Sequence, residues 1–162
     1  MMFPFRKSLV SIKNAVTTPN THSLYPGVVG RNILSYHNQK DTDKMVDPKR
    51  VLSYEDMLKV IDAPKKVIID VRNPDEVAST GKIPSSINIP LSNVDNTLAS
   101  MSNEDFRRQF QREKPSSNDE LIFYCRSGRR SSEALDKALK LGYTNSKTYL
   151  GSWDEWSRRN NK

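Results

Sequence analysis

The residues best suited to chemistry are Cys125 and those that follow it directly, Cys125-Arg126-Ser127-Gly128-Arg129-Arg130-Ser131. They come after an apolar run at 121–124 and before a helix-forming stretch, which predicts a strand, a short loop and a helix. The backbone N–H groups of such a loop and the N-terminus of its helix point at an anion held between them. We therefore predict that this loop stabilises a Cys125 thiolate, with three arginines adding positive charge.

The chemistry that this site could perform is nucleophilic attack by sulfur. A helix N-terminus and neighbouring cations both lower the pKa of a thiol from its usual value of about 8.5, so we expect Cys125 to be partly ionised near neutral pH. The alternative is a buried core cysteine, because a lone cysteine often packs as a small apolar side chain. The flanking arginines and Gly128 favour the reactive site.

The chain of 162 residues fits one domain preceded by a basic N-terminal segment. Residues 1–40 contain five Lys or Arg and no acid, so they hold five of the seven formal positive charges. Apolar residues recur in this segment at helical spacing: Phe5, Leu9, Ile12 and Val16. This pattern is typical of a mitochondrial transit peptide, and a basic tail without a destination is the alternative. We expect a transit peptide and linker over 1–47, a folded domain over 48–162, and a location in the mitochondrial matrix.

Composition argues against several other classes of function. Beyond residue 40 the basic residues alternate with acidic ones and form no stripe with aromatic residues, so we do not expect nucleic-acid binding. The apolar stretches are too short for a membrane span. Both histidines, His22 and His37, lie in the N-terminal segment, so no metal site and no cofactor are predicted. A single cysteine excludes an intramolecular disulfide, and the oligomeric state stays open.

From Val51 onward, short apolar runs alternate with amphipathic helical stretches, which predicts an α/β domain with a mainly parallel sheet. Ser53, Asn73 and Ser102 each stand where an N-cap begins a helix. The apolar runs predict strands at 67–71, 87–89, 121–124 and 148–150. A helix is expected over 131–141, and the two tryptophans of a terminal helix are expected to be packing residues rather than a cofactor site.

Three stretches taken together resemble the rhodanese family, the single-domain thiosulfate sulfurtransferases. They are Asp70-Val71-Arg72-Asn73-Pro74-Asp75-Glu76 with residues 81–90, the Cys125 loop, and residues 142–156. Their order and spacing agree with the family from residue 51 to about 158, and the basic presequence makes the chain look like a fungal or other eukaryotic mitochondrial member. The family usually has His where Lys82 stands and Gly at the positions of Ser85 and Ser152. The resemblance implies a three-layer domain with a mainly parallel five-stranded sheet and helices on both faces.

The resemblance also implies a two-step sulfur transfer. Cys125 would attack the outer sulfur of thiosulfate, release sulfite and hold the sulfur as a persulfide, which a thiol or cyanide then removes. Backbone N–H groups from Arg126 to Arg130 would stabilise the thiolate and the persulfide, while Gly128 permits the tight turn. The expected substrate-binding residues are therefore Arg126, Ser127, Gly128, Arg129, Arg130 and Ser131.

Individual side chains carry further expectations. Arg130, the last residue before the expected helix, is our choice for the sulfonate oxygens of the donor, assisted by Arg126 or Arg129. Ser131 either caps the helix or donates a hydrogen bond to the site.

The end of the central strand carries charged residues as well. Asp70 and Arg72 are expected to form a structural ion pair near the site, because open α/β sheets place their sites at the ends of strands. Glu76 is expected to be a solvated helix carboxylate, with orientation of Arg72 as the alternative, and Lys82 a solvated loop residue.

Two other functions use the same scaffold. Rhodanese-like phosphatases and arsenate reductases have five residues between Cys and Arg, whereas four separate Cys125 from Arg130, and this shorter loop suits a sulfur atom better than a phosphate. A non-catalytic binding or sulfur-carrier module is the other alternative. Such modules often lack the cysteine, so the intact nucleophile with flanking arginines favours an enzyme.

Overall fold

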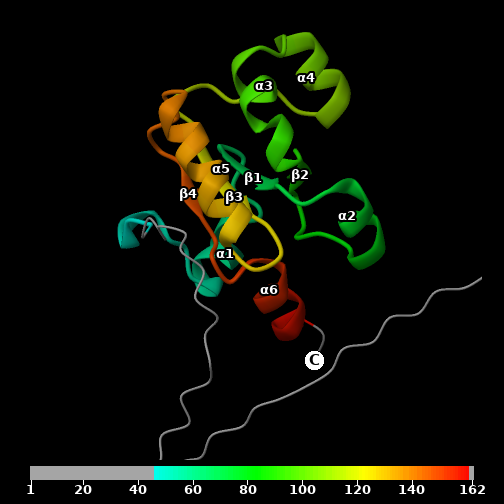
Figure 1. Ribbon diagram of the computed structural model, residues 1–162, viewed down its shortest axis with the longest axis vertical. Coiled ribbons are helices and arrows are strands. Elements are labelled where there is room, and N and C mark those ends of the chain that lie inside the picture. Colours follow the sequence, from blue (N-terminus) through cyan, green and yellow to red (C-terminus); the bar gives the residue numbers. More distant parts are fainter. Residues whose placement is uncertain (1–45, 161–162) are drawn as a thin grey trace, which may run out of the picture. The chain divides into compact units, whose positions relative to one another are not determined.

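A parallel β-sheet runs through the part of the chain that the computed structural model describes, residues 46 to 160 (Figure 1). Its strands lie in the order β2-β1-β3-β4 and are all parallel. The strands are β1 (Lys66–Asp70), β2 (Ile87–Asn88), β3 (Glu120–Tyr124) and β4 (Lys147–Thr148). The predicted transit peptide lies outside the described residues, apart from its last two positions.

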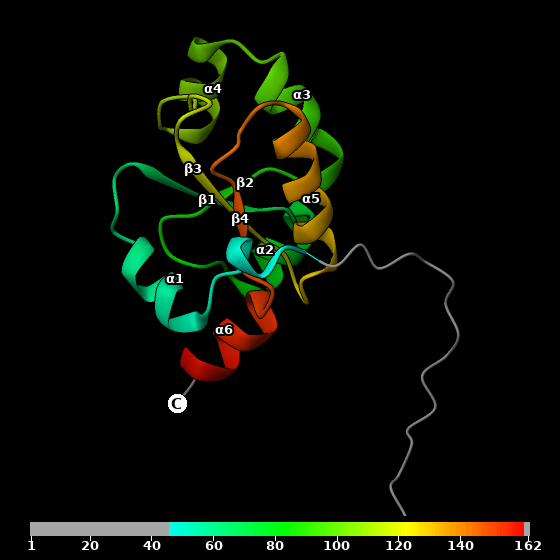
Figure 2. The same cartoon turned by 90° about the vertical axis from the view of Figure 1, so that its left-hand side faces the viewer.

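Helices cover both faces of this sheet, as an α/β domain requires (Figure 2). The α-helices are α1 (Tyr54–Val60), α2 (Pro74–Thr80), α3 (Val94–Ala99), α4 (Asn103–Phe110), α5 (Arg129–Lys140) and α6 (Ser152–Asn160). Two short 3-10 helices, η1 (Pro48–Arg50) and η2 (Leu91–Asn93), precede α1 and α3. The three-layer α/β architecture is confirmed.

Alternating side chains of the strands build two separate apolar cores, because successive residues of a strand point to opposite faces. Leu121 and Phe123 of β3 pack toward α3, α4 and α5, where Cys125 also lies. Ile122 and Tyr124 pack toward α1 and α6, which contributes Trp156. By contrast, α2 has no buried side chain, so polar contacts must hold it in place.

The sheet has four strands where we expected five. In place of a fifth strand there is one isolated parallel bridge, in which Val51 pairs with Thr148 of β4. Val51 directly follows η1, and Ser53 already caps α1 two residues later, so no length remains for a ladder. The capping box predicted for α1 is present, since the Ser53 hydroxyl accepts from the Asp56 amide at 3.1 Å.

The register of the two central strands places the candidate site at one edge of the sheet. Asp70, the last residue of β1, lies opposite Tyr124, the last residue of β3. The chain segments that leave both strands therefore start side by side. Because Cys125 comes directly after Tyr124 and Arg72 two residues after Asp70, both are brought to the same edge.

Candidate active site

Cys125 lies in a loop of four residues between β3 and α5. The helix α5 begins at Arg129, two residues earlier than predicted. Its side chain is 1% exposed and lines the apolar core beneath α5. On its other side the sulfur accepts a hydrogen bond from the backbone N–H of Gly128 at 3.1 Å. The cysteine is therefore buried like a core residue and yet faces a hydrogen-bond donor like a reactive thiolate, so it combines the two alternatives that the sequence left open.

Four donors decide the ionisation of this thiol. Burial by itself raises the pKa of Cys125, because a desolvated thiolate is unfavourable. The backbone N–H groups of Ser131, Gly128 and Ser127 and the hydroxyl of Ser152 act in the opposite direction by favouring the anion. They outweigh burial, so the pKa of Cys125 is lowered from its ordinary value. Of the donors predicted in the run from Arg126 to Arg130, Ser127 and Gly128 act on the sulfur, and Ser131 lies one residue beyond that run.

The start of α6 orients the first two peptide groups of the loop. The amide of Trp153 donates to the carbonyl of Cys125 at 3.0 Å, and the amide of Asp154 donates to the carbonyl of Arg126 at 3.0 Å. The C=O and N–H of a trans peptide point in opposite directions, so these bonds turn the N–H groups of Arg126 and Ser127 away from α6, and the Ser127 N–H favours the thiolate. Ser152 completes this arrangement, since its hydroxyl accepts from the Cys125 amide at 3.2 Å and lies 3.9 Å from the sulfur.

Gly128 is required at its position for two reasons. Its φ is +98°, in the region that favours glycine, and it is the N-cap of α5. A Cβ atom there would lie 2.7 Å from the carbonyl oxygen of Leu150, a backbone atom that cannot move aside easily. The tight turn predicted for Gly128 is therefore confirmed.

Ser131 holds the loop through its side chain and serves the sulfur through its backbone. Its hydroxyl donates to the carbonyl of Gly128 at 2.8 Å and accepts from the Thr148 hydroxyl at 2.9 Å. Gly128 occupies the N-cap position, so Ser131 is not the cap. Of the two roles considered for Ser131, the one toward the site has support, through the amide, which lowers the pKa of Cys125, rather than through the hydroxyl.

Asp70 and Arg72 form the expected ion pair, with Arg72 Nη2 2.6 Å from Asp70 Oδ2 and both side chains almost fully buried. The same guanidinium donates to the Thr80 hydroxyl at 2.8 Å and to the Gly81 carbonyl at 2.7 Å, at the end of α2. Its carbon lies 4.9 Å from the centre of the Trp153 ring. Arg72 therefore joins β1, α2 and α6 behind the loop.

Arg130 is engaged by Glu76, which corrects our expectation for that carboxylate. Arg130 Nη1 lies 2.5 Å from Glu76 Oε2 and Nη2 lies 2.7 Å from Oε1, so both terminal nitrogens of the guanidinium group are bound to the carboxylate. Glu76 is 27% exposed and is not a freely solvated helix residue. The hydrogen bonds from Arg130 lower the pKa of Glu76 to about 2. Nothing in sequence spacing pointed to this pair.

Three more basic side chains were considered for the site. Arg126 is exposed, and its Nε lies 3.6 Å from Asp154. Arg129 is exposed and, within residues 46–160, makes no ion pair. Lys82 is exposed but is not purely solvated, because its amino group donates to the carbonyl of Ser86 at 2.9 Å.

Two of the three departures from the family pattern fall on unusual backbone. Ser85 has φ +62° and Ser152 has φ +53°, values that glycine adopts without strain. The turn geometry at both positions is therefore the one that suits glycine, held here by serine. We missed three site residues in the sequence: Ser152, Trp153 and Asp154. The signal that could have pointed to them was Ser152, which stands where the family usually has glycine.

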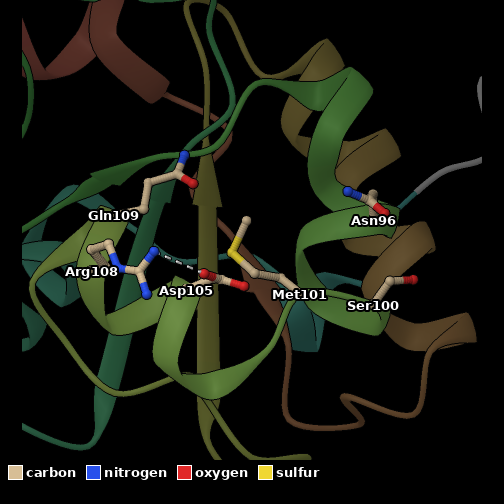
Figure 3. Close-up of a pocket in the computed structure, with 6 residues that line it drawn as sticks. All are labelled: Asn96, Ser100, Met101, Asp105, Arg108 and Gln109. Atoms are coloured by element: carbon tan, nitrogen blue, oxygen red, sulfur yellow. Dashed lines mark ion pairs between the residues drawn. The ribbon is translucent and has the colours of Figure 1, made fainter.

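A hollow of about 460 Å³ lies elsewhere, between α3 and α4 (Figure 3). Its lining is polar apart from one methionine: Asn96, Ser100, Met101, Asp105, Arg108 and Gln109. Asp105 and Arg108 form an ion pair there at 3.4 Å. Neither α3 nor α4 is an element of the Cys125 site, so this hollow is not part of it.

Residues 53–159 match the family of the Rhodanese-like domain. The chain belongs to this family. This rhodanese-like protein is 36% identical to the thiosulfate:glutathione sulfurtransferase of Saccharomyces cerevisiae over 124 residues, which are 75% of this chain and 88% of that protein. It is 45% identical over 91 residues to the putative thiosulfate sulfurtransferase, mitochondrial, of Schizosaccharomyces pombe, covering 56% of this chain and 63% of the relative. The structure of the human single-domain sulfurtransferase TSTD1 superposes with a TM-score of 0.63 at 32% identity, covering 68% and 97% of the two chains.

Proposed function

We propose that this rhodanese-like protein is a thiosulfate sulfurtransferase that carries sulfur as a Cys125 persulfide and passes it to a thiol. The observation that carries the proposal is the set of backbone N–H groups that converge on the Cys125 sulfur and lower its pKa. A thiolate is the nucleophile that the reaction needs. The names of its relatives, which include thiosulfate sulfurtransferases, support this assignment.

The first step is an attack of the Cys125 thiolate on the outer sulfur of thiosulfate. A new S–S bond forms to Cys125, and the S–S bond of thiosulfate breaks with its electron pair, which leaves on sulfite. The product is a persulfide anion one sulfur longer than the thiolate. The N–H groups of Ser127, Gly128 and Ser131 are preorganised for negative charge on both species, so little reorganisation accompanies the transfer.

The second step returns the enzyme to its starting state. An acceptor thiolate attacks the terminal sulfur, the bond to Cys125 breaks, and the electron pair stays on Cys125 as a thiolate. The acceptor leaves as a persulfide, and no external oxidant or reductant is needed. The same donors that stabilise the nucleophile in the first step stabilise the leaving thiolate in the second.

Exposed cations at the rim are suited to anionic substrates. Arg129 and Arg126 are exposed beside the loop, and thiosulfate is a dianion. We assign the sulfonate oxygens of the donor mainly to Arg129, with Arg126 assisting, because the fork of Arg130 is filled by Glu76. A small anionic thiol such as glutathione would meet the same two arginines through its carboxylates. The name of the yeast relative supports glutathione as the acceptor.

The phosphatase alternative has less support in this geometry. Phosphoryl transfer depends on an arginine that grips the phosphate oxygens, and the two amino groups of Arg130 are bound to Glu76. A module that only binds a partner would leave the lowered pKa of Cys125 without a use.

Mitochondrial import is the proposed use of residues 1–47. The segment is basic and free of acids over 1–40, and the fission yeast relative is named mitochondrial. Within the described part of the chain, no helix has both the length and the apolar character to cross a bilayer. Residues 1–47 fused to a fluorescent protein should carry it into the matrix, where it should be resistant to protease added to intact mitochondria. A diffuse cytosolic signal would contradict the proposal.

Release of sulfite tests the assignment of activity. The wild-type protein mixed with thiosulfate and glutathione should release sulfite continuously, whereas Cys125→Ser should lose more than about a thousandfold of the rate, the scale for a lost nucleophile. Far-UV circular dichroism of the variant should match the wild type, because serine fits the space of cysteine. Continuous sulfite release by folded Cys125→Ser would contradict the persulfide mechanism.

A further inference from the structure

The ion pair of Glu76 and Arg130 joins two parts of the fold that the apolar core leaves unconnected. α2 has no buried side chain, so its placement depends on polar contacts. At its C-terminal end, Arg72 donates to Thr80 and Gly81. At its N-terminal end, Glu76 accepts from the Asn73 amide at 3.1 Å and binds both amino groups of Arg130. Arg130 is therefore the contact that holds the N-terminal end of α2 against α5.

Arg130 lies next to the donors that serve the nucleophile. It is the second residue of α5, and the amide of the following residue, Ser131, favours the Cys125 thiolate. A two-point contact between Glu76 and Arg130 restrains this first turn of α5 more strongly than a single hydrogen bond would. Any loosening of the turn would move the Ser131 amide relative to Cys125.

The pair also changes the charge that a substrate meets. Charged groups approach Cys125 from β1, α2, the loop, α5 and α6, and most of them are matched: Arg72 with Asp70, Arg130 with Glu76, and Arg126 with Asp154. The Arg126 contact is long and exposed, so solvent weakens it. Arg129 has no ion pair within residues 46–160. The attraction for an anion therefore comes from Arg129 and Arg126, while Arg130 is neutralised.

We propose that Glu76 is a positioning residue for sulfur transfer, which holds Arg130 so that the first turn of α5 stays fixed and the Arg130 charge is withdrawn from the substrate. Glu76 acts through Arg130 and does not touch the reacting sulfur. This inference rests on the proposed sulfurtransferase function for its kinetic part. Its structural part depends only on the contacts of Glu76.

A cycle of two neutral substitutions tests the proposal. Glu76→Gln leaves the Arg130 cation unpaired near Cys125, so the pKa of Cys125 should fall, and Arg130→Gln leaves the Glu76 carboxylate unpaired, so the pKa should rise. The double variant removes both charges, so its pKa should lie between those of the two single variants. The pKa is measured from the pH dependence of iodoacetamide alkylation, which requires no sulfur donor.

Kinetics supply the second readout. All three variants should lose about tenfold in kcat, since each loosens the first turn of α5, while KM for thiosulfate should change less than about threefold. Arg130→Lys keeps the charge but loses the planar two-point contact, so it should shift the pKa less than Arg130→Gln does and share the loss of kcat. It also replaces Arg130→Gln should that variant fail to fold. Glu113→Gln, which breaks an exposed ion pair with Arg107 in α4, is the matched control and should leave both readouts unchanged.

Three results would overturn the role of Glu76. The first is a shift of the Cys125 pKa in the same direction for Glu76→Gln and Arg130→Gln, and the second is an unchanged kcat in folded Glu76→Gln. The third is a KM that rises more than about tenfold in Arg130→Gln and falls in Glu76→Gln, because a direct substrate contact of Arg130 would produce that pattern. Failure of the proposed function is distinguishable. If the wild-type protein releases no sulfite from thiosulfate, that function is wrong, while the alkylation cycle still decides whether Glu76 positions the loop.

Discussion

The carbonyl oxygen of Leu150 lies 2.7 Å from the position that a Cβ atom on Gly128 would occupy, so the segment between β4 and α6 is in backbone contact with the cysteine loop. Since the Gly128 amide is also a donor to Cys125, a change at this position affects fold and chemistry together. The loop therefore depends on α6 for its shape as well as on its own residues.

Gly128→Ala should destabilise the protein and remove activity. The added methyl group would clash with backbone and would adopt a φ that alanine disfavours, so the free energy of unfolding should fall by about 2 kcal/mol or more. Urea unfolding gives the stability, and sulfite release gives the activity. Gly142→Ala is the control: its φ is +91°, but a Cβ there would have no neighbour within 4 Å, so it should cost less and spare activity. Equal effects of the two substitutions would contradict the steric argument.

Ser152 separates hydrogen bonding from backbone strain. Ser152→Ala and Ser152→Gly both remove the hydroxyl near Cys125, so both should move the alkylation profile of Cys125 to higher pH. Only glycine relieves the positive φ, so Ser152→Gly should be more stable than Ser152→Ala by about 1 kcal/mol. An unchanged alkylation profile would show that the hydroxyl does not favour the thiolate.

Much of this arrangement follows from local sequence. The apolar runs placed the main strands, the residues at 53–56 indicated the capping box, and the position of Asp70 and Arg72 at a strand end indicated their ion pair. The loop between β3 and α5 predicted donors around Cys125 because strand, turn and helix follow one another directly. These features depend on residues that are close in the chain.

Contacts between distant segments were the ones that could not be predicted. Glu76 and Arg130 are 54 positions apart, and their pairing depends on where the tertiary fold places α2 relative to α5. In the same way, the amides of Trp153 and Asp154 reach the loop only because β4 brings α6 beneath it. The prediction of a fifth strand was wrong because Val51 is the C-cap of η1 and Ser53 is the N-cap of α1. These two caps lie too close together for a strand to form between them.

Acid should remove the contribution of Glu76 to stability. Its pKa is lowered from 4.5 to about 2 in the folded protein, so its stabilising effect is fully present above pH 5 and is lost as the pH falls toward 2. Glu76→Gln lacks that effect at every pH. The free energies of unfolding of the wild type and Glu76→Gln should therefore differ by about 1 kcal/mol at pH 7 and converge by pH 2.

Urea titrations of both proteins between pH 7 and pH 2 give this difference directly. Because the other carboxylates titrate in both proteins, their effects cancel in the comparison. A difference that stays constant across the whole range would contradict the lowered pKa of Glu76.

Arg129 should control the affinity for the donor. Arg129→Ala should raise KM for thiosulfate about tenfold and leave kcat within about twofold, because the side chain is exposed and meets the sulfonate rather than the reacting sulfur. The effect should shrink as salt is added, since an exposed charge is screened. Arg107→Ala on α4 removes an exposed arginine elsewhere and should not alter KM. An unchanged KM in Arg129→Ala would remove Arg129 from the substrate site.

The central claim is that Cys125 carries the transferred sulfur, and intact mass measures it most directly. The purified protein should gain the mass of one sulfur atom after incubation with thiosulfate and lose it again when glutathione is added. Cys125→Ser should show no gain under the same conditions. A wild-type protein whose mass does not change with thiosulfate, or a gain that persists in Cys125→Ser, would contradict the account.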